Sequence, residues 1–246
     1  MAVVGCSGMA FHGIKAIVFD KDGTLADSHS FLRNLAQKRA RLLDAQVPGV
    51  QEPLLLAFGV EGDALDPQGL MAVGSRSENA IAAAAYVAET GRSWAAALEL
   101  AKSTFADADQ YLTPKAPLTP PYPETAEMLT RLSAGGLKIG VLSSDSTAHV
   151  EEFLRCHQLD TYVDQVQGAE EGGLSKPAPE LLWQMCDRLA VEPAATLVVG
   201  DSEIDLKLAR AGQAAGFIAV SWSNAAGLMQ AADAVIQSWS ELDLEG

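Results

Sequence analysis

The chain has 246 residues, of which 48% are hydrophobic and 20% are charged, and this composition is ordinary for a globular protein. That length suits one large domain, or a core domain that carries a smaller inserted one. Its 32 acidic and 17 basic residues give a formal net charge of −15. The balance argues against nucleic-acid partners and against binding to anionic membranes, because both require basic patches. It also implies that an anionic substrate must be held by a local cation.

The N-terminal segment lacks the basic start and the long apolar stretch of a signal peptide, and no run reaches the ~20 apolar residues that a membrane span needs. The three cysteines are widely spaced and include no C-x-x-C pair, which favours reduced thiols in a reducing compartment over a metal cluster. We therefore expect a cytoplasmic protein. No pattern in the sequence indicates an oligomeric state.

The predicted elements alternate along most of the chain. The first is a buried strand at 14–19, where an apolar run ends in polar residues. A stretch with helical patterns but no clear strand follows, with helices predicted at 31–43, 78–89 and 94–106, and a proline-rich linker closes it at 113–123. Beyond the linker, the patterns predict helices at 123–133, 147–156, 179–190 and 204–211, and strands at 137–142, 196–199, 216–220 and 234–236.

Strands that alternate with helices indicate a parallel sheet built from βαβ units with right-handed crossovers. The predicted fold class is therefore α/β: a Rossmann-like parallel sheet core with helices on both faces, plus an inserted α-helical domain. The core domain is expected to comprise residues 1–27 and 115–246, and the helical domain residues 28–114. In the first helix of that insertion, the basic residues are expected to form a solvated face; they are Arg33, Lys38, Arg39 and Arg41.

Acidic residues gather where two of the predicted strands end. Asp20 and Asp22 follow the first strand, and Gly23 gives the backbone the freedom to turn both carboxylates toward one crevice. Asp201 and Asp205 follow a later strand, and their spacing of four predicts a shared face on the next helix. An Asp-Gly turn and acids that complement a helix dipole are the alternative explanations. Converging carboxylates would repel each other without a hard cation, and oxygen ligands in this number suit Mg²⁺.

Two further features suit phosphate binding. Ser143 and Ser144 close the strand at 137–142, and they offer a hydroxyl and a backbone N–H near the start of a helix, a common cradle for phosphate. Lys176 lies in a loop between Gly-Gly and Pro-Ala-Pro. An exposed loop lysine is usually only solvated, but one in a loop that prolines stiffen is expected to point toward a specific group.

These residues, in this order, resemble the four motifs of the haloacid dehalogenase-like (HAD) hydrolase superfamily. The first motif, D-x-D-G-T-L, matches 20–25; the second, a strand-ending Ser or Thr, matches Ser143; the third, K-P-x-P, begins at Lys176; the fourth, G-D-x-x-x-D, matches 200–205. The resemblance spans residues 14–221. The helical insertion, and the Pro-Glu-Leu-Leu after the lysine, are similar to the phosphoglycolate phosphatase-like subgroup, in which the insertion is a helical cap.

The resemblance implies catalytic roles for two carboxylates. Asp20 would attack phosphorus and form an aspartyl-phosphate, which divides one hard hydrolysis into two easier steps. Asp22 would protonate the leaving alkoxide and later deprotonate the attacking water. Dehalogenases of the superfamily lack this second acid, because halide needs no proton on leaving. Its presence therefore favours phosphate-ester chemistry.

The resemblance also implies a ligand set and a substrate class. Mg²⁺ would be held by the Asp20 carboxylate, the Asp22 carbonyl and Asp201, with support from Asp205. The transferring phosphoryl group would be bound by Ser143, Ser144 and Lys176. The substrate is expected to be a small phosphorylated metabolite, either phosphoglycolate-like or a sugar phosphate.

Two alternatives are weighed against a phosphatase. A phosphomutase similar to β-phosphoglucomutase shares every one of these motifs and stays open. A non-catalytic scaffold is disfavoured, because an idle site has no physical reason to keep clustered acids. One departure from the family concerns the substrate: relatives usually follow the serine of the second motif with Asn and often Lys, where this chain has Ser144 and Asp145.

Overall fold

The structure, a computed structural model, describes residues 2–170, 172–222 and 230–245. It divides into two units, Met1–Asp27 with Thr119–Gly246, and Ser28–Leu118. The second unit extends slightly beyond the boundary expected after residue 114, and its action as a cap stays a prediction. Among the described residues, no helix is both long enough and apolar enough to span a membrane.

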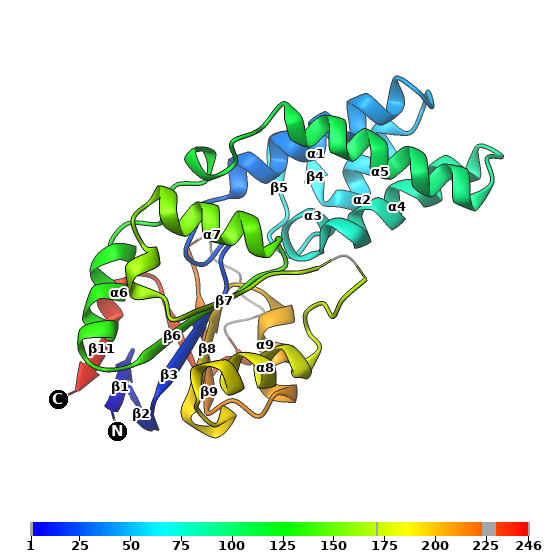
Figure 1. Cartoon of the computed structure of the whole chain (residues 1–246). Helices are drawn as coiled ribbons and strands as arrows, with labels where there is room; N and C mark the ends of the chain where they lie inside the picture. The colour runs from blue at the N-terminus through cyan, green and yellow to red at the C-terminus, as the bar shows by residue number, and fades with distance from the viewer. Residues whose placement is uncertain (1, 171, 223–229, 246) are drawn as a thin grey trace. The chain divides into compact units, whose positions relative to one another are not determined.

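The first unit is built on a six-stranded sheet with the order β10-β9-β8-β3-β6-β7, in which neighbouring strands run parallel (Figure 1). Its strands are β3 (Ala16–Phe19), β6 (Lys138–Leu142), β7 (Gln165–Gln167), β8 (Thr196–Gly200), β9 (Gly216–Val220) and β10 (Ala234–Ile236). The register pairs Phe19 with Val141 on one side and with Val199 on the other, so β3, β6 and β8 end at one edge of the sheet. The predicted α/β fold class is confirmed.

Helices cover both faces of this sheet; they are α6 (Thr125–Ala134), α7 (Thr147–Cys156), α8 (Pro179–Leu189) and α9 (Glu203–Ala211). Figure 1 shows α8 and α9 on one face and α6 and α7 on the other. Strand β3 explains this arrangement, because all four of its residues are buried. Ala16 and Val18 pack in the core that α8 and α9 share with the sheet, whereas the Phe19 ring meets Trp239 edge to face. A continuous apolar run is what a strand covered on both faces requires.

A second, antiparallel sheet in this unit was not predicted from the sequence. It has the order β11-β1-β2, with β1 at Ala2–Cys6, β2 at Met9–Ile14 and β11 at Leu242–Glu245. Ser7 and Gly8 join β1 to β2, and their φ angles of 48° and 83° suit a tight hairpin turn. The predicted start of the strand at 14–19 is wrong, because Ile14 is the last residue of β2 and β3 begins at Ala16.

The second unit consists mainly of helices around a core of its own. They are α1 (His29–Asp44), α2 (Gln51–Phe58), α3 (Leu70–Val73), α4 (Arg76–Glu89) and α5 (Trp94–Gln110), and the three predicted helices lie within α1, α4 and α5. The expectation that no strand interrupts them is wrong. A short hairpin, β4 (Val60–Glu61) with β5 (Ala64–Leu65), turns at Gly62, whose φ is 58°.

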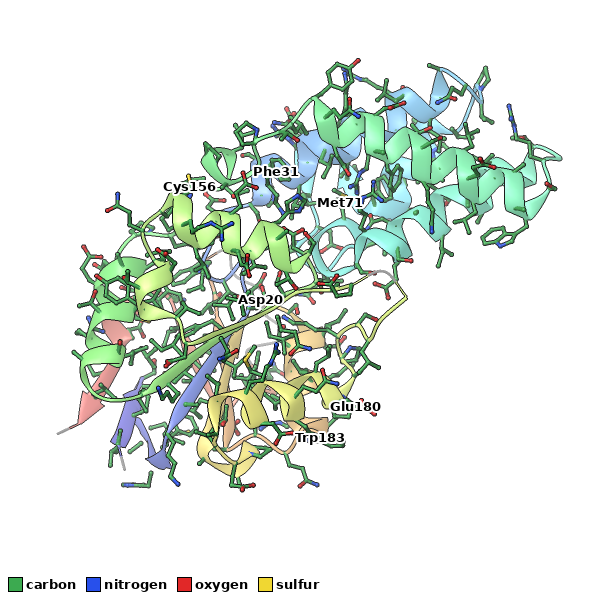
Figure 2. All side chains as sticks on the ribbon, in the orientation of Figure 1. Asp20, Phe31, Met71, Cys156, Glu180 and Trp183 are labelled. Carbon is green, nitrogen blue, oxygen red and sulfur yellow. The ribbon has the colours of Figure 1, made fainter. Side chains whose placement is uncertain are left out.

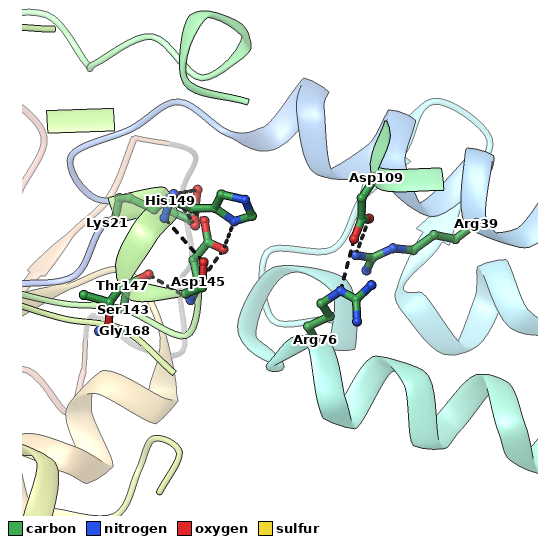
Figure 3. Close-up of polar contacts among 11 residues, drawn as sticks. Lys21, Arg39, Arg76, Asp109, Ser143, Asp145, Thr147, His149 and Gly168 are labelled. Carbon is green, nitrogen blue, oxygen red and sulfur yellow. Dashed lines mark hydrogen bonds and ion pairs between the residues drawn. The ribbon is translucent and has the colours of Figure 1, made fainter. Parts of the chain in front are cut away.

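One basic residue of α1 also differs from expectation. Arg39 was expected on the solvated face, but it is only 5% exposed. Its Nη2 donates to Asp109 Oδ1 at 2.8 Å, and Arg76 Nε donates to Asp109 Oδ2 at 3.0 Å (Figure 3). The guanidinium also lies over the Phe105 ring, 4.4 Å from its centroid. An arginine can be buried here because its charge is paired and its planar head is stacked.

Candidate active site

Asp20 lies directly after β3, at the carboxyl edge of the parallel sheet (Figure 2), and is only 9% exposed. The chain then turns sharply, and the N–H of Ala26 donates to the Lys21 carbonyl at 2.9 Å. Gly23 has a φ of +82°, and a Cβ at this position would lie 2.2 Å from Asp201 Oδ2. Glycine is therefore required both by the turn and by the close approach of the second acidic segment.

That second segment comes from the β8–α9 connection. Ser202 is the N-cap of α9: its Oγ accepts from the Asp205 N–H at 3.2 Å and donates to Asp205 Oδ2 at 2.6 Å. Asp201 precedes the helix, so the prediction that Asp201 and Asp205 share a helix face is wrong. The tight entry into α9 brings them together instead. On the other side, Thr24 Oγ1 donates to Asp201 Oδ1 at 3.2 Å and ties this segment to the turn after β3.

Three carboxylates and a lysine meet at this edge. Asp20, Asp201 and Asp205 each contribute an oxygen to a cluster whose members all lie within 4.8 Å of one another. Lys176 is 8% exposed, and its Nζ donates to Asp20 Oδ1 at 2.6 Å and to Asp205 Oδ1 at 2.7 Å. A buried ammonium requires such partners. The loop before α8 thus directs its lysine into the acidic cluster.

Burial and mutual repulsion shift the pKa values in this cluster. Burial is the largest cause of the raised pKa of Asp20, about 7, which Lys176 opposes and Asp205 increases. Burial, Asp20 and Asp205 together hold the pKa of Asp201 well above its usual range. Burial by itself would lower the pKa of Lys176, but its two carboxylate partners outweigh burial and raise it. The cluster therefore carries an excess of negative charge that a bound cation would relieve.

Asp22 pairs with a different lysine. Lys21 Nζ lies 2.7 Å and 2.6 Å from the two carboxylate oxygens of Asp22, and 3.2 Å from Asp145 Oδ2. The other oxygen of Asp145 lies 3.0 Å from His149 Nδ1 (Figure 3). Sequence reasoning gave Lys21 no role. Two features of the sequence could have pointed to it: a lysine lies inside the D-x-D motif, and an acid at 145 stands where relatives differ. Only the fold, however, brings the side chains of Lys21 and Asp145 together.

The serines of the second motif lie at the same edge of the sheet. Ser143 follows β6 and is 4% exposed; its N–H donates to the Gln167 carbonyl at 2.9 Å, and its Oγ accepts from the Asp145 N–H at 3.1 Å. Ser144 is the next residue and is partly exposed. Since β3 lies between β6 and β8, Asp20, Ser143 and Asp201 directly follow three neighbouring strands. Their individual roles stay predictions.

Comparison with known proteins finds a matching family and several similar proteins. A family model described as haloacid dehalogenase-like hydrolase matches residues 14–213. Phosphoglycolate phosphatase from Escherichia coli (strain K12) is 28% identical over 202 residues, which cover 82% of this chain and 79% of that protein. The protein of the same name from Salmonella typhimurium is 29% identical over 199 residues, covering 80% and 78%.

Solved structures resemble the fold over nearly the whole chain. A predicted phosphoglycolate phosphatase from Haemophilus somnus 129pt superposes with a TM-score of 0.67 at 22% identity, covering 93% of this chain and 96% of that one. A protein described only as a candidate β-phosphoglucomutase from Thermotoga maritima gives 0.62 at 19% identity, covering 93% and 96%. At these identities the likeness concerns the fold alone.

Proposed function

This chain belongs to the haloacid dehalogenase-like hydrolase family, as its motifs predicted, and we propose that it is a Mg²⁺-dependent phosphatase of small phosphorylated metabolites. The observation that carries the proposal is the buried cluster in which Lys176 lies between Asp20 and Asp205, with Asp201 beside them. A nucleophilic carboxylate, a cation for phosphoryl oxygens and oxygen ligands for a metal are the groups that this chemistry needs.

The residues present fit a magnesium ion. Hard divalent cations prefer carboxylate and carbonyl oxygens, and the raised pKa values of Asp20 and Asp201 indicate that the cluster lacks positive charge. We propose that Asp20, Asp201 and the Asp22 carbonyl hold the ion. Asp205 supports them, since its two oxygens already engage Lys176 and Ser202. When bound, the ion would neutralise charge on the phosphoryl oxygens and orient them.

In the proposed reaction Asp20 attacks phosphorus as the ester bond to the substrate oxygen breaks. The leaving oxygen takes a proton from Asp22. In the second step Asp22 takes a proton from water, whose oxygen attacks phosphorus and releases Asp20. Lys176 and Ser143, with the backbone N–H of Ser144, bind the phosphoryl oxygens. Lys176 also reduces the repulsion between the Asp20 carboxylate and the approaching phosphate dianion.

The relatives support a substrate class. Curated relatives named phosphoglycolate phosphatase cover most of this chain, which supports a small phosphate monoester such as 2-phosphoglycolate. A phosphomutase would use the same groups and pass the phosphoryl to a second substrate hydroxyl. The fold of the candidate β-phosphoglucomutase favours that alternative only weakly.

The test is phosphate release from 2-phosphoglycolate and from a panel of sugar phosphates and alkyl phosphates. We expect release that requires Mg²⁺ and that is lost in Asp20→Asn. Asp243→Asn is the matched control, because this aspartate is exposed and pairs with Arg131 at 3.6 Å. Absence of release from every ester would overturn the proposal. Isomerisation of a sugar phosphate with little release would establish the mutase instead.

A further inference from the structure

Lys21 is the most deeply buried lysine near the candidate active site. It has 0% exposure, and its Nζ contacts both oxygens of Asp22 and one of Asp145. Its ammonium also lies 5.7 Å from the centroid of the Phe153 ring on α7. A buried charge is tolerated only where partners hold it, so the position of the ammonium is fixed by the two carboxylates and the ring.

The second of those carboxylates is itself held firmly. Asp145 Oδ1 accepts from the Ser146 N–H at 2.9 Å and lies 3.0 Å from His149 Nδ1, while Oδ2 faces Lys21 at 3.2 Å (Figure 3). Its own N–H donates to Ser143 Oγ at 3.1 Å. Asp145 is thus anchored in the β6–α7 connection by contacts that do not involve Asp22.

We propose that Lys21 is a positioning residue for Asp22 and that Asp145 is its permanent counter-ion. This inference rests on the proposed function, in which Asp22 gives a proton to the leaving oxygen and takes one from water. Asp145 takes no part in that reaction, and its contact with Lys21 gives the buried ammonium a second carboxylate partner that stays in place. The ammonium in turn fixes the side chain of Asp22, because it spans both carboxylate oxygens.

A positioning role differs from a structural one in its dependence on the leaving group. An alkyl phosphate needs a proton on its departing oxygen, but p-nitrophenyl phosphate releases a stable phenolate that needs little help. The ratio kcat/KM reports only the steps up to departure of that group. Lys21→Met should therefore lower kcat/KM for an alkyl phosphate such as phosphoglycolate by about 10²-fold, and that for p-nitrophenyl phosphate far less. Equal losses on both esters would overturn the inference.

A double-mutant cycle makes the dependence on Asp22 explicit. In an Asp22→Asn background the general acid is absent, so adding Lys21→Met should cost little further kcat/KM on the alkyl ester. A loss of the same size as in the wild-type background would mean that Lys21 acts independently of Asp22, which contradicts the inference. Wild-type protein that releases no phosphate from either ester would contradict the proposed function itself, so the two failures are distinguishable.

Two further variants guard against misfolding. Asp145→Asn keeps the shape but removes the counter-ion, and it should show the same preference for the aryl ester with a smaller loss. If Lys21→Met does not fold, this variant decides: an equal loss on both esters overturns the inference. Lys138→Met is the matched control, because it removes an exposed ion pair with Asp164 of 2.7 Å in the same unit. It should leave both values of kcat/KM unchanged.

Discussion

The ion-pair cluster around Lys176 in the α/β unit and the cluster around Asp109 in the helical unit differ in the balance of their charges. In the α/β unit, Lys176 is shared by carboxylates that are nearly closed to solvent. In the helical unit the ratio is reversed: Asp109 is shared by Arg39 and Arg76 (Figure 3), and 49% of the Arg76 side chain is exposed. Water relieves the second imbalance but not the first. The buried excess of negative charge around Lys176 therefore suits a cationic ligand, whereas the solvated excess of positive charge around Asp109 is compatible with a structural role.

Removal of the central lysine should have the largest effect. Lys176→Met takes away the cation that faces Asp20 and the phosphoryl oxygens, so we expect kcat to fall by about 10²–10³-fold. Arg76→Met removes a cation from the solvated cluster and should change kcat little. Rates of phosphate release at saturating substrate measure both. Comparable losses of kcat in the two variants would show that the two clusters do not differ in their importance for catalysis.

The close approach of the two acidic segments gives the next largest effect. In Gly23→Ala the new Cβ would lie 2.2 Å from Asp201 Oδ2, so the carboxylate must move. We expect a higher Mg²⁺ concentration for half-maximal activity, and a stability loss of about 1–3 kcal/mol from the positive φ. Gly8→Ala is the matched control, since its φ is +83° and no atom lies within 4 Å of a new Cβ. Gly8→Ala should lose stability, but its Mg²⁺ concentration for half-maximal activity should equal that of the wild type.

The pH dependence of stability tests the excess charge directly. Asp20 has an ordinary pKa near 3.8 when unfolded and about 7 in the folded, metal-free protein. Between these values the folded state holds a proton that the unfolded state has released. This contribution to stability is complete below pH 4 and is lost as the pH rises through 7. Urea denaturation in EDTA should therefore show stability falling across this window. Asp20→Asn should make stability depend less on pH. A rise in stability over the same pH window would contradict the raised pKa of Asp20.

The smallest effects are expected in the helical unit. Arg39→Met breaks the partly buried contact with Asp109 and the stack on Phe105, so we expect a loss of about 1–3 kcal/mol in the free energy of unfolding. Arg76→Met removes a partner of the same carboxylate, but an exposed one, and should cost less than about 1 kcal/mol. Urea midpoints compare the two. A larger loss for Arg76 would show that burial does not set the strength of these pairs.

Much of the parallel sheet was predictable, because both of its faces are covered and its strands are short apolar runs. The strands at Gly216–Val220 and Ala234–Ile236 and the helix at Thr147–Cys156 agree with the predicted bounds. Strand β7, Gln165–Gln167, was missed because it is a polar strand at the edge of the sheet. The antiparallel sheet was missed because β2 is mostly exposed and lacks a clear apolar alternation.

For the site, the sequence located the acids but not all of their partners. Strand ends and spacing predicted that Asp20 and Asp201 would meet, since both follow strands of one parallel sheet. The sequence could not predict that Lys21 is buried, because a lysine in a turn is usually exposed. Nor could spacing place Asp201 before the helix and Asp205 within it, since that depends on where Ser202 caps α9. Which side chains pair within the site therefore depends on the fold.

The proposed reaction requires that Asp20 carries the phosphoryl group between its two steps. Rapid acid quench of the enzyme with substrate and Mg²⁺, followed by mass spectrometry of its peptides, measures this directly. We expect a phosphorylated peptide that contains Asp20 and is absent both in EDTA and in Asp20→Asn. A phosphoryl group on any other residue, or undiminished phosphate release by Asp20→Asn, would contradict the proposed reaction.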